Sequence, residues 1–190
     1  MKAEDKIKLE KCSGAGTAWR GHGEFAYWLV EHIRPDVVVD LGVGQGYSTF
    51  VFANPNIGHV YGIDWFEMPL ILDVLEAYKE DNEINNLTFI KGDISDIVKT
   101  WDKPIDILHI DGTHDYGAVK RDFNSWSTFV RDTGVILMHD TVSYLHHVGK
   151  LFAEIGGYHK LNFKNSEGLG VLTKDEGLMD AIRRWQIENR

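Results

Sequence analysis

The sequence predicts an α/β protein with a doubly wound, mostly parallel sheet of about seven strands. Short apolar runs alternate with amphipathic segments along most of the chain. The runs lack the in-and-out alternation of a half-exposed strand, which indicates burial on both faces, as in parallel sheets. With 190 residues, 43% of them hydrophobic, the chain is long enough to bury a core as one domain. We therefore expect a single domain over 1–190, with an N-terminal arm (1–23), a core (24–174) and a C-terminal helix (175–190).

The expected elements follow one another in a repeating order. Residues 24–34 carry apolar side chains at helical spacing and stop before Pro35, so they predict the first helix. The same patterns predict strands at 37–40, 59–64, 87–93, 105–111 and 134–140, and helices at 68–82, 95–101, 116–130 and 145–155. Strands that alternate with helices in this way form parallel sheets through right-handed crossovers.

The end of the core breaks this order. Two strand-like runs, 158–164 and 168–174, are separated only by Asn165, Ser166 and Glu167, which predicts an antiparallel hairpin closing the sheet. The last stretch, 175–189, has a loosely amphipathic pattern typical of a helix that packs on its own sheet. Contact between two copies of the chain in a homodimer is the alternative.

The net charge and the cysteine content limit the kinds of binding partner and the cellular compartment that we expect. The net charge of −9 opposes a nucleic-acid-binding surface, which would have to be basic. Apolar runs such as 105–110 are far shorter than the roughly 20 residues that span a bilayer, and the start of the chain is too polar for a signal peptide. Cys12 is the single cysteine and allows no internal disulfide. We expect a cytoplasmic protein without nucleic-acid or membrane partners.

An acid stands at the end of each expected strand of the parallel part of the sheet. These acids are Asp40, Asp64, Asp93, Asp111 and Asp140. Because ligands of open α/β sheets bind beyond the carboxyl ends of the strands, this rim is the expected site. Gly42, Gly44 and Gly46 follow the first strand and permit a close backbone approach to a ligand. A dinucleotide fingerprint would place its third glycine one position later, so an NAD site is disfavoured.

The segment DLGVGQG, residues 40–46, resembles the first motif of class I S-adenosylmethionine (SAM)-dependent methyltransferases, whose sheet is Rossmann-like. The resemblance implies that Asp40 and the glycine loop surround the amino-acid part of SAM and that Asp64 binds the ribose hydroxyls. It further implies that Asp93 lies beside the adenine and that Ile94 contacts the ring. Trp65, which follows the ribose acid, is a candidate for stacking on the adenine.

The segment IDGTHDYGAVKRD, residues 110–122, resembles macrocin, mycinamicin and cephalosporin-tailoring O-methyltransferases. In that family the acid at the strand end, here Asp111, binds a divalent metal, and the His three residues on, here His114, acts as base. His139 and Asp140 stand where further ligands come from. His139 stands where several relatives have a carboxylate, which weakens the case for Mg²⁺, a hard ion, because an imidazole ligand better suits Mn²⁺, Fe²⁺ or Zn²⁺.

These observations predict methyl transfer from SAM to an oxygen of a small-molecule acceptor, a sugar or a polyhydroxylated metabolite. Two alternatives remain open: a metal-independent methyltransferase with His114 as base, and a nucleotide-binding module without turnover.

Other polar and aromatic side chains near the two motifs are expected to have structural roles. Asp115 is expected to cap the helix that follows it, and Arg121 and Asp122 are expected on the outer surface of that helix. In the N-terminal arm, Trp19, Arg20 and His22 either close over the site as a lid or belong to a loosely held segment.

Overall fold

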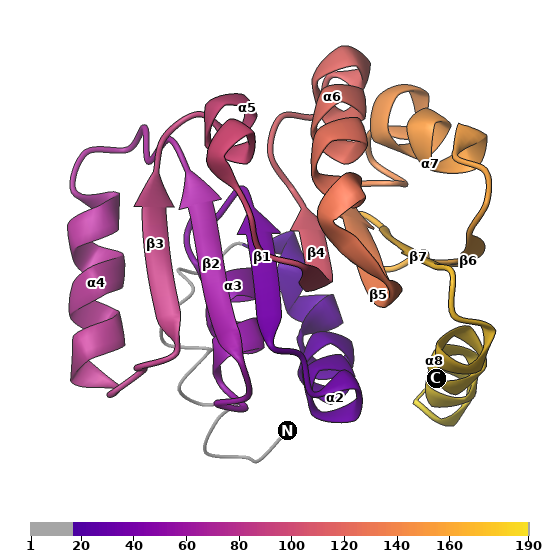
Figure 1. Ribbon diagram of the computed structural model, residues 1–190, viewed down its shortest axis with the longest axis horizontal. Helices are drawn as coiled ribbons and strands as arrows, with labels where there is room; N and C mark the ends of the chain where they lie inside the picture. The colour runs from indigo at the N-terminus through magenta and orange to yellow at the C-terminus, as the bar shows by residue number, and fades with distance from the viewer. Residues whose placement is uncertain (1–16, 190) are drawn as a thin grey trace.

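The computed structural model describes residues 17–189, which form a seven-stranded sheet with helices on both faces (Figure 1). The strands are β1 (Val37–Leu41), β2 (His59–Asp64), β3 (Leu87–Lys91), β4 (Ile105–Ile110), β5 (Val130–His139), β6 (His159–Phe163) and β7 (Leu169–Thr173). They lie in the order β3-β2-β1-β4-β5-β7-β6, and β7 alone runs against its neighbours. The predicted doubly wound sheet with an antiparallel C-terminal hairpin is confirmed. Cys12 and the rest of 1–16 lie outside the described residues.

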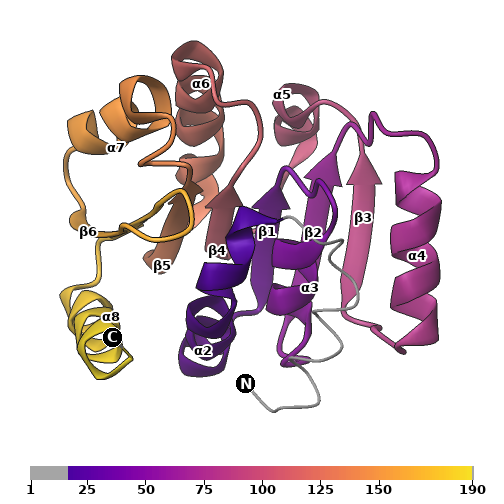
Figure 2. The same cartoon turned by 180° about the vertical axis from the view of Figure 1, so that it is seen from behind.

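Helices cover both faces of the sheet. They are η1 (Ala18–His22), α2 (Gly23–Ile33), α3 (Tyr47–Ala53), α4 (Ile71–Asp81), α5 (Ile94–Ile97), η2 (Val98–Thr100), α6 (Tyr116–Trp126), η3 (Ser127–Phe129), η4 (Leu145–Gly149), α7 (Lys150–Glu154) and α8 (Glu176–Glu188). Helices α2, α3 and α8 pack on one face, and α5, α6 and α7 pack on the other (Figures 1 and 2). Helix α4 lies beside the edge strand β3 (Figure 1).

Two hydrophobic cores result, one on each face of the sheet. Val38 of β1 and Ile107 of β4 contribute to the core under α2, α3 and α8. Their neighbours Val39 and Leu108 contribute to the core under α6 and α7. All four side chains are fully buried. Successive residues therefore enter opposite cores, which explains why these strands are apolar without interruption.

The segment between α6 and β5 differs from the sequence prediction. The helix expected to reach residue 130 ends at Trp126, and the strand expected from 134 already begins at Val130. Val130 pairs with Ile105, and Arg131 Nε lies 3.0 Å from the Asp106 carboxylate of β4. Pairing with β4 thus extends the strand through polar residues whose sequence carries no strand pattern.

The C-terminal helix packs on its own sheet, as predicted. Leu178, Met179 and Ile182 of α8 are buried in the core shared with α2. The helix expected at 145–155 is divided, since the π-helical turn η4 precedes α7. Within residues 17–189, no helix combines the length and apolar character required for a membrane span.

Asp106 joins three strands at the end of the sheet opposite the acidic rim. Its Oδ2 accepts hydrogen bonds from the backbone N–H groups of Asp36 and Val37, and its Oδ1 contacts Arg131. We expect Asp106→Ala to lower the free energy of unfolding by about 1–3 kcal/mol, measured by urea denaturation, because it orphans these donors. Ligand binding at the rim should be unchanged. Asp132→Ala, which removes an exposed carboxylate, is the control, and an equal effect of both variants would contradict this role.

Candidate active site

The carboxyl ends of the five parallel strands meet at one edge of the sheet, where two cavities open. A cavity of about 730 Å³ is lined by the glycine loop, the loops after β2 and β3, and α6. A second, more open cavity of about 580 Å³ is lined by residues that follow β4 and β5. Asp111 and His114 line both cavities. The structure therefore places these two predicted residues at the junction of two adjoining spaces.

The glycine loop connects β1 to α3 and forms one wall of the large cavity. Gly42, Gly44 and Gly46 all have positive φ, between 52° and 93°, a conformation that favours glycine. A β-carbon built on Gly42 would lie 2.1 Å from the carbonyl oxygen of Asp111, so the loop packs directly on the end of β4. A β-carbon on Gly44 would meet nothing within 4 Å, since this residue borders the large cavity.

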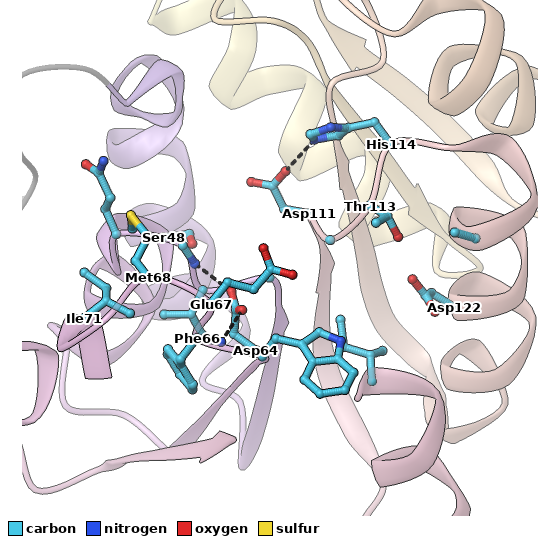
Figure 3. Close-up of a pocket in the computed structure, with 18 of the residues that line it drawn as sticks. Ser48, Asp64, Phe66, Glu67, Met68, Ile71, Asp111, Thr113, His114 and Asp122 are labelled. Atoms are coloured by element: carbon cyan, nitrogen blue, oxygen red, sulfur yellow. Dashed lines mark hydrogen bonds and ion pairs between the residues drawn. The ribbon is translucent and has the colours of Figure 1, made fainter. Parts of the chain in front are cut away.

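Asp64, at the end of β2, is held by backbone donors. Its Oδ2 accepts from Gly44 N–H and its Oδ1 accepts from Phe66 N–H, each at 2.9 Å. The carboxylate thus joins the glycine loop to the loop after β2 and lines the cavity (Figure 3). Its remaining lone pairs can accept further hydrogen bonds. Trp65 follows with 56% of its surface exposed and also lines the cavity.

Asp40 is fully buried beneath the loop and is not among the residues that line the cavity. Its Oδ2 accepts from the hydroxyls of Ser48 and Thr49, and its Oδ1 accepts from His109 Nδ1 at 2.6 Å. His109 Nε2 in turn accepts from the indole N–H of Trp19 at 3.1 Å. Asp40 therefore supports the glycine loop from below through the start of α3.

Asp93 and Ile94 follow β3 and line the far end of the large cavity. Asp93 is the N-cap of α5 and accepts from Ser95 N–H at 2.7 Å. Hydrogen bonds from Ser95 lower the pKa of this half-buried carboxyl. Asp93 thus combines a helix-capping role with a position at the cavity.

A cluster of two acids and two histidines lies where β4 and β5 end. His114 Nε2 is 2.7 Å from Asp140 Oδ2 and 3.9 Å from Asp111 Oδ1, and its ring stacks on Tyr144. His139 Nδ1 is 3.4 Å from both Asp111 Oδ1 and Asp140 Oδ2. One ligand atom from each of Asp111, His139 and Asp140 lies within 4.8 Å of the others. These three residues, which the sequence grouped as candidate metal ligands, are brought together.

Charge within this cluster shifts every pKa. Contacts with Asp111 and Asp140 raise the pKa of His114 to about 9. Burial alone would lower the pKa of His139, but the same two carboxylates raise it to about 10. Burial opposes ionisation of Asp111 and Asp140, yet the two histidines lower the pKa of both acids. The cluster therefore favours a positive charge between the two carboxylates.

The hairpin between β6 and β7 determines the orientation of His139. Its Nε2 lies 3.1 Å from the carbonyl oxygen of Ser166, which can only accept, so Nε2 carries the proton. In neutral His139 the lone pair of Nδ1 then faces two carboxylates. His139 Nδ1 and the two carboxylate oxygens are all hydrogen-bond acceptors, so their close approach requires a cation or a proton between them. The donor set, one imidazole and two carboxylates, fits a divalent metal whose His ligand is oriented by a backbone carbonyl.

The structure corrects the placement of Asp122. Arg121 and Asp122 were both expected on the outer surface of their helix, and Arg121 is exposed at the mouth of the large cavity, but Asp122 is buried and lines that cavity. Asp122 is only 8% exposed. The spacing contains a signal for this position, because Asp122 lies four residues after Ala118, which also faces the cavity on α6. The N-cap role of Asp115 is confirmed, since its carboxylate accepts from Gly117 and Ala118 N–H.

The described part of the N-terminal arm packs against the site. Trp19 and His22 of η1 are buried, whereas Arg20 is exposed. Trp19 lines the large cavity, and His22 Nε2 lies 3.0 Å from the Ser166 carbonyl that also contacts His139. Burial, followed by the nearby His139, lowers the pKa of His22 to about 4. In this conformation η1 forms part of the wall behind the two cavities.

Comparison with known proteins assigns the family. A family model described as a methyltransferase domain matches residues 39–141. This chain belongs to that family. The methyltransferase domain is also 30% identical over 184 residues to the uncharacterized protein R132 of Acanthamoeba polyphaga mimivirus, which covers 85% of the chain and 81% of the relative. It is 30% identical over 176 residues, 82% of the chain, to the uncharacterized protein y4gI of Sinorhizobium fredii, of whose length it spans only 19%.

Solved structures share the fold of this methyltransferase domain. The SAH-bound methyltransferase PaMTH1 of Podospora anserina superposes with a TM-score of 0.72 at 11% identity, covering 93% of this chain and 89% of that one. An O-methyltransferase of Bacillus cereus in complex with SAH gives 0.69 at 16% identity, covering 92% of both chains. TomG of Streptomyces achromogenes, in complex with SAM, gives 0.68 at 14% identity and covers 87% and 88%. The fold is the Rossmann-like methyltransferase fold.

The buried Asp122 carboxyl makes stability depend on pH. Burial raises its pKa from 3.8 to about 6. A carboxyl whose pKa is higher in the folded than in the unfolded chain stabilises the fold below the unfolded value and loses this contribution as the pH rises through the folded value. Relative to Asp122→Asn, the wild type should therefore lose about 1–3 kcal/mol of unfolding free energy between pH 4 and pH 7. Urea denaturation across this range measures the difference, with the exposed Asp96→Asn as control; a pH-independent difference would contradict the assignment.

Proposed function

We propose that this methyltransferase domain transfers a methyl group from SAM to an oxygen atom of a small molecule, such as a sugar or another polyhydroxylated metabolite. The proposal depends on one observation, that the two cavities at the rim share Asp111 and His114. A cofactor in the large cavity and an acceptor in the open one would meet at an acid and an imidazole. O-methylation needs such alignment and a group that takes the hydroxyl proton. The resemblance of residues 110–122 to small-molecule O-methyltransferases supports the acceptor class.

The large cavity would hold SAM along the ends of β1, β2 and β3. Gly42, Gly44 and Gly46 leave room for the amino-acid part, and Asp40 supports this loop from beneath. The Asp64 carboxylate is already oriented by two backbone donors and would accept from the ribose hydroxyls. Trp65, Asp93 and Ile94 border the space left for the adenine. Crystal structures of other proteins that contain SAM or SAH on this fold support the choice of cofactor.

Asp111, His139 and Asp140 would hold a divalent ion beside the acceptor. Their ligand atoms converge within 4.8 Å, and the Ser166 carbonyl orients His139 with its Nδ1 lone pair toward the carboxylates. When bound, such an ion would lower the pKa of the acceptor hydroxyl. One imidazole with two carboxylates suits Mn²⁺ better than Mg²⁺, which prefers oxygen ligands.

His114 is the proposed base. With Asp111 and Asp140 both facing it, its pKa of about 9 keeps a proton on the ring at neutral pH. The ring must be neutral to accept the acceptor proton, so competition for these carboxylates by a cation would favour the base form. Stacking on Tyr144 holds the ring in place beside the open cavity.

A metal-independent methyltransferase is the second candidate. Its observation is the contact of 2.7 Å between His114 Nε2 and Asp140, because a carboxylate at this distance can orient an imidazole without a metal; His114 would then act as base at a pH near or above its raised pKa of about 9. A nucleotide-binding module without turnover is the third. It would bind SAM and transfer no methyl group to any acceptor.

Asp111→Asn tests the division between cofactor binding and catalysis. We expect methyl transfer from labelled SAM, measured across a panel of small hydroxylated acceptors, to fall by about 100-fold or more, since the variant weakens both the His114 contact and the ligand set. The Kd for SAH, measured by calorimetry, should change by less than about threefold. Asp115→Asn is the matched control, because Asn also caps helices. Parallel loss of activity and SAH affinity in Asp111→Asn would argue against the proposal.

Titration with Mn²⁺ tests the metal site. We expect calorimetry to show one tight Mn²⁺ site per chain in the wild type and an affinity lowered by about tenfold or more in His139→Ala. His146→Ala, which removes an exposed imidazole from η4, should bind as the wild type does. Equal binding by both variants, or no binding by the wild type, would favour the metal-independent alternative.

A further inference from the structure

Asp122 is a buried carboxylate on α6 that the cluster at Asp111 does not use. Its side chain is 8% exposed and lines the large cavity. Among residues 17–189, no side chain or backbone group donates a hydrogen bond to its carboxylate, whose oxygens are open to the cavity. Burial of a carboxylate without a donor is costly, so buried polar groups normally have a partner. A carboxylate of this kind in a ligand cavity indicates that the ligand supplies the donor.

Asp122 borders a narrow slot at the adenine end of the cavity. Figure 3 shows it on the α6 side, across the cavity from Asp64. A β-carbon built on Gly112 would lie 3.8 Å from Asp122 Oδ2 and 3.3 Å from Ile94 Cδ1. Glycine at position 112 therefore keeps a gap open between an apolar side chain and a carboxylate. A flat ring with a hydrogen-bond donor on its edge has the chemistry to fill it.

The donors of SAM limit what Asp122 can bind. SAM offers the amino-acid ammonium, two ribose hydroxyls and the 6-amino group of adenine. Under the proposed function, the glycine loop faces the amino-acid part of SAM and Asp64, which is held by two backbone donors, faces the ribose. The 6-amino group is the donor that remains for a carboxylate beside Ile94.

Asp93 and Asp122 are both acids at this end of the cavity, but their surroundings differ. Asp93 is half-buried, and Ser95 already donates to it. Asp122 is buried and has no donor among residues 17–189, so a hydrogen bond from the ligand would stabilise it more. The neighbouring Arg121 favours the ionised form, which can only accept.

We propose that Asp122 accepts a hydrogen bond from the 6-amino group of adenine and makes the cavity selective for adenine over a 6-oxopurine. This inference rests on the placement of SAM under the proposed function. A 6-oxo group would place an acceptor against an unpartnered carboxylate, and sites that hydrogen-bond a substrate donor reject analogues that lack it. Asp122 is thus a specificity residue for the cofactor, outside the methyl-transfer centre.

Calorimetry with SAH and with S-inosylhomocysteine, its 6-oxopurine analogue, tests this role. We expect the wild type to bind SAH at least about tenfold more tightly than the analogue. In Asp122→Asn this ratio should fall to about threefold or less, because the amide N–H₂ can donate to a 6-oxo group. Asp93→Asn is the matched comparison: it neutralises another carboxylate of the same cavity, retains a capping residue, and should keep the wild-type ratio.

The outcomes separate this inference from the proposed function. The proposed role of Asp122 is wrong if the wild type binds SAH but Asp122→Asn keeps the same preference for SAH over S-inosylhomocysteine. It is also wrong if only Asp93→Asn loses that preference. In both cases the proposed SAM site is unaffected. If the wild type binds neither ligand, the proposed function fails first. Gly112→Ala is a second variant that adds a methyl group to the slot without requiring a positive φ. It should weaken SAH binding by about tenfold, and unchanged binding would contradict the slot.

Discussion

The buried carboxylate of Asp40 holds together the three segments that form the back of the candidate site. It accepts from Ser48 and Thr49 at the start of α3 and from His109 of β4, and His109 accepts from Trp19 of η1. Removing one partner of a buried charge destabilises a protein by about 3–5 kcal/mol. The folded structure therefore requires these donors to be in place together. The position of the glycine loop, the end of β4 and η1 thus depends on one acid that lies outside the cavity itself.

The acids of the rim differ in what they can offer a ligand, because their partners differ. Backbone N–H groups hold Asp64, and a helix cap engages Asp93. Two imidazoles face Asp111 and Asp140 and make their contacts mutually dependent. Asp122 faces the large cavity and accepts no hydrogen bond from residues 17–189. The acids at this rim therefore differ in role according to their surroundings: some are held by backbone donors, some face a positive charge, and Asp122 is available to a ligand.

Particular elements show how far the sequence predicted the structure. The continuous apolar strands and the hairpin around Ser166 were predicted because their periods and turn residues are local signals. The start of β5 was missed because pairing with β4 and the contact of Arg131 with Asp106 decide it. Asp122 was misplaced because a charged residue on a helix is usually exposed, and its spacing of four residues from Ala118 was not considered.

Local sequence patterns specify the alternation of strands and helices, the glycine loop and the acid at each strand end, since each of these depends on neighbouring residues. Tertiary structure decided which of these acids converge. Asp111 meets Asp140 because β4 lies beside β5, and His139 presents Nδ1 to both because the hairpin returns the Ser166 carbonyl to its Nε2. Such contacts join residues far apart along the chain, and strand order and side-chain orientation, which no local pattern encodes, bring them together.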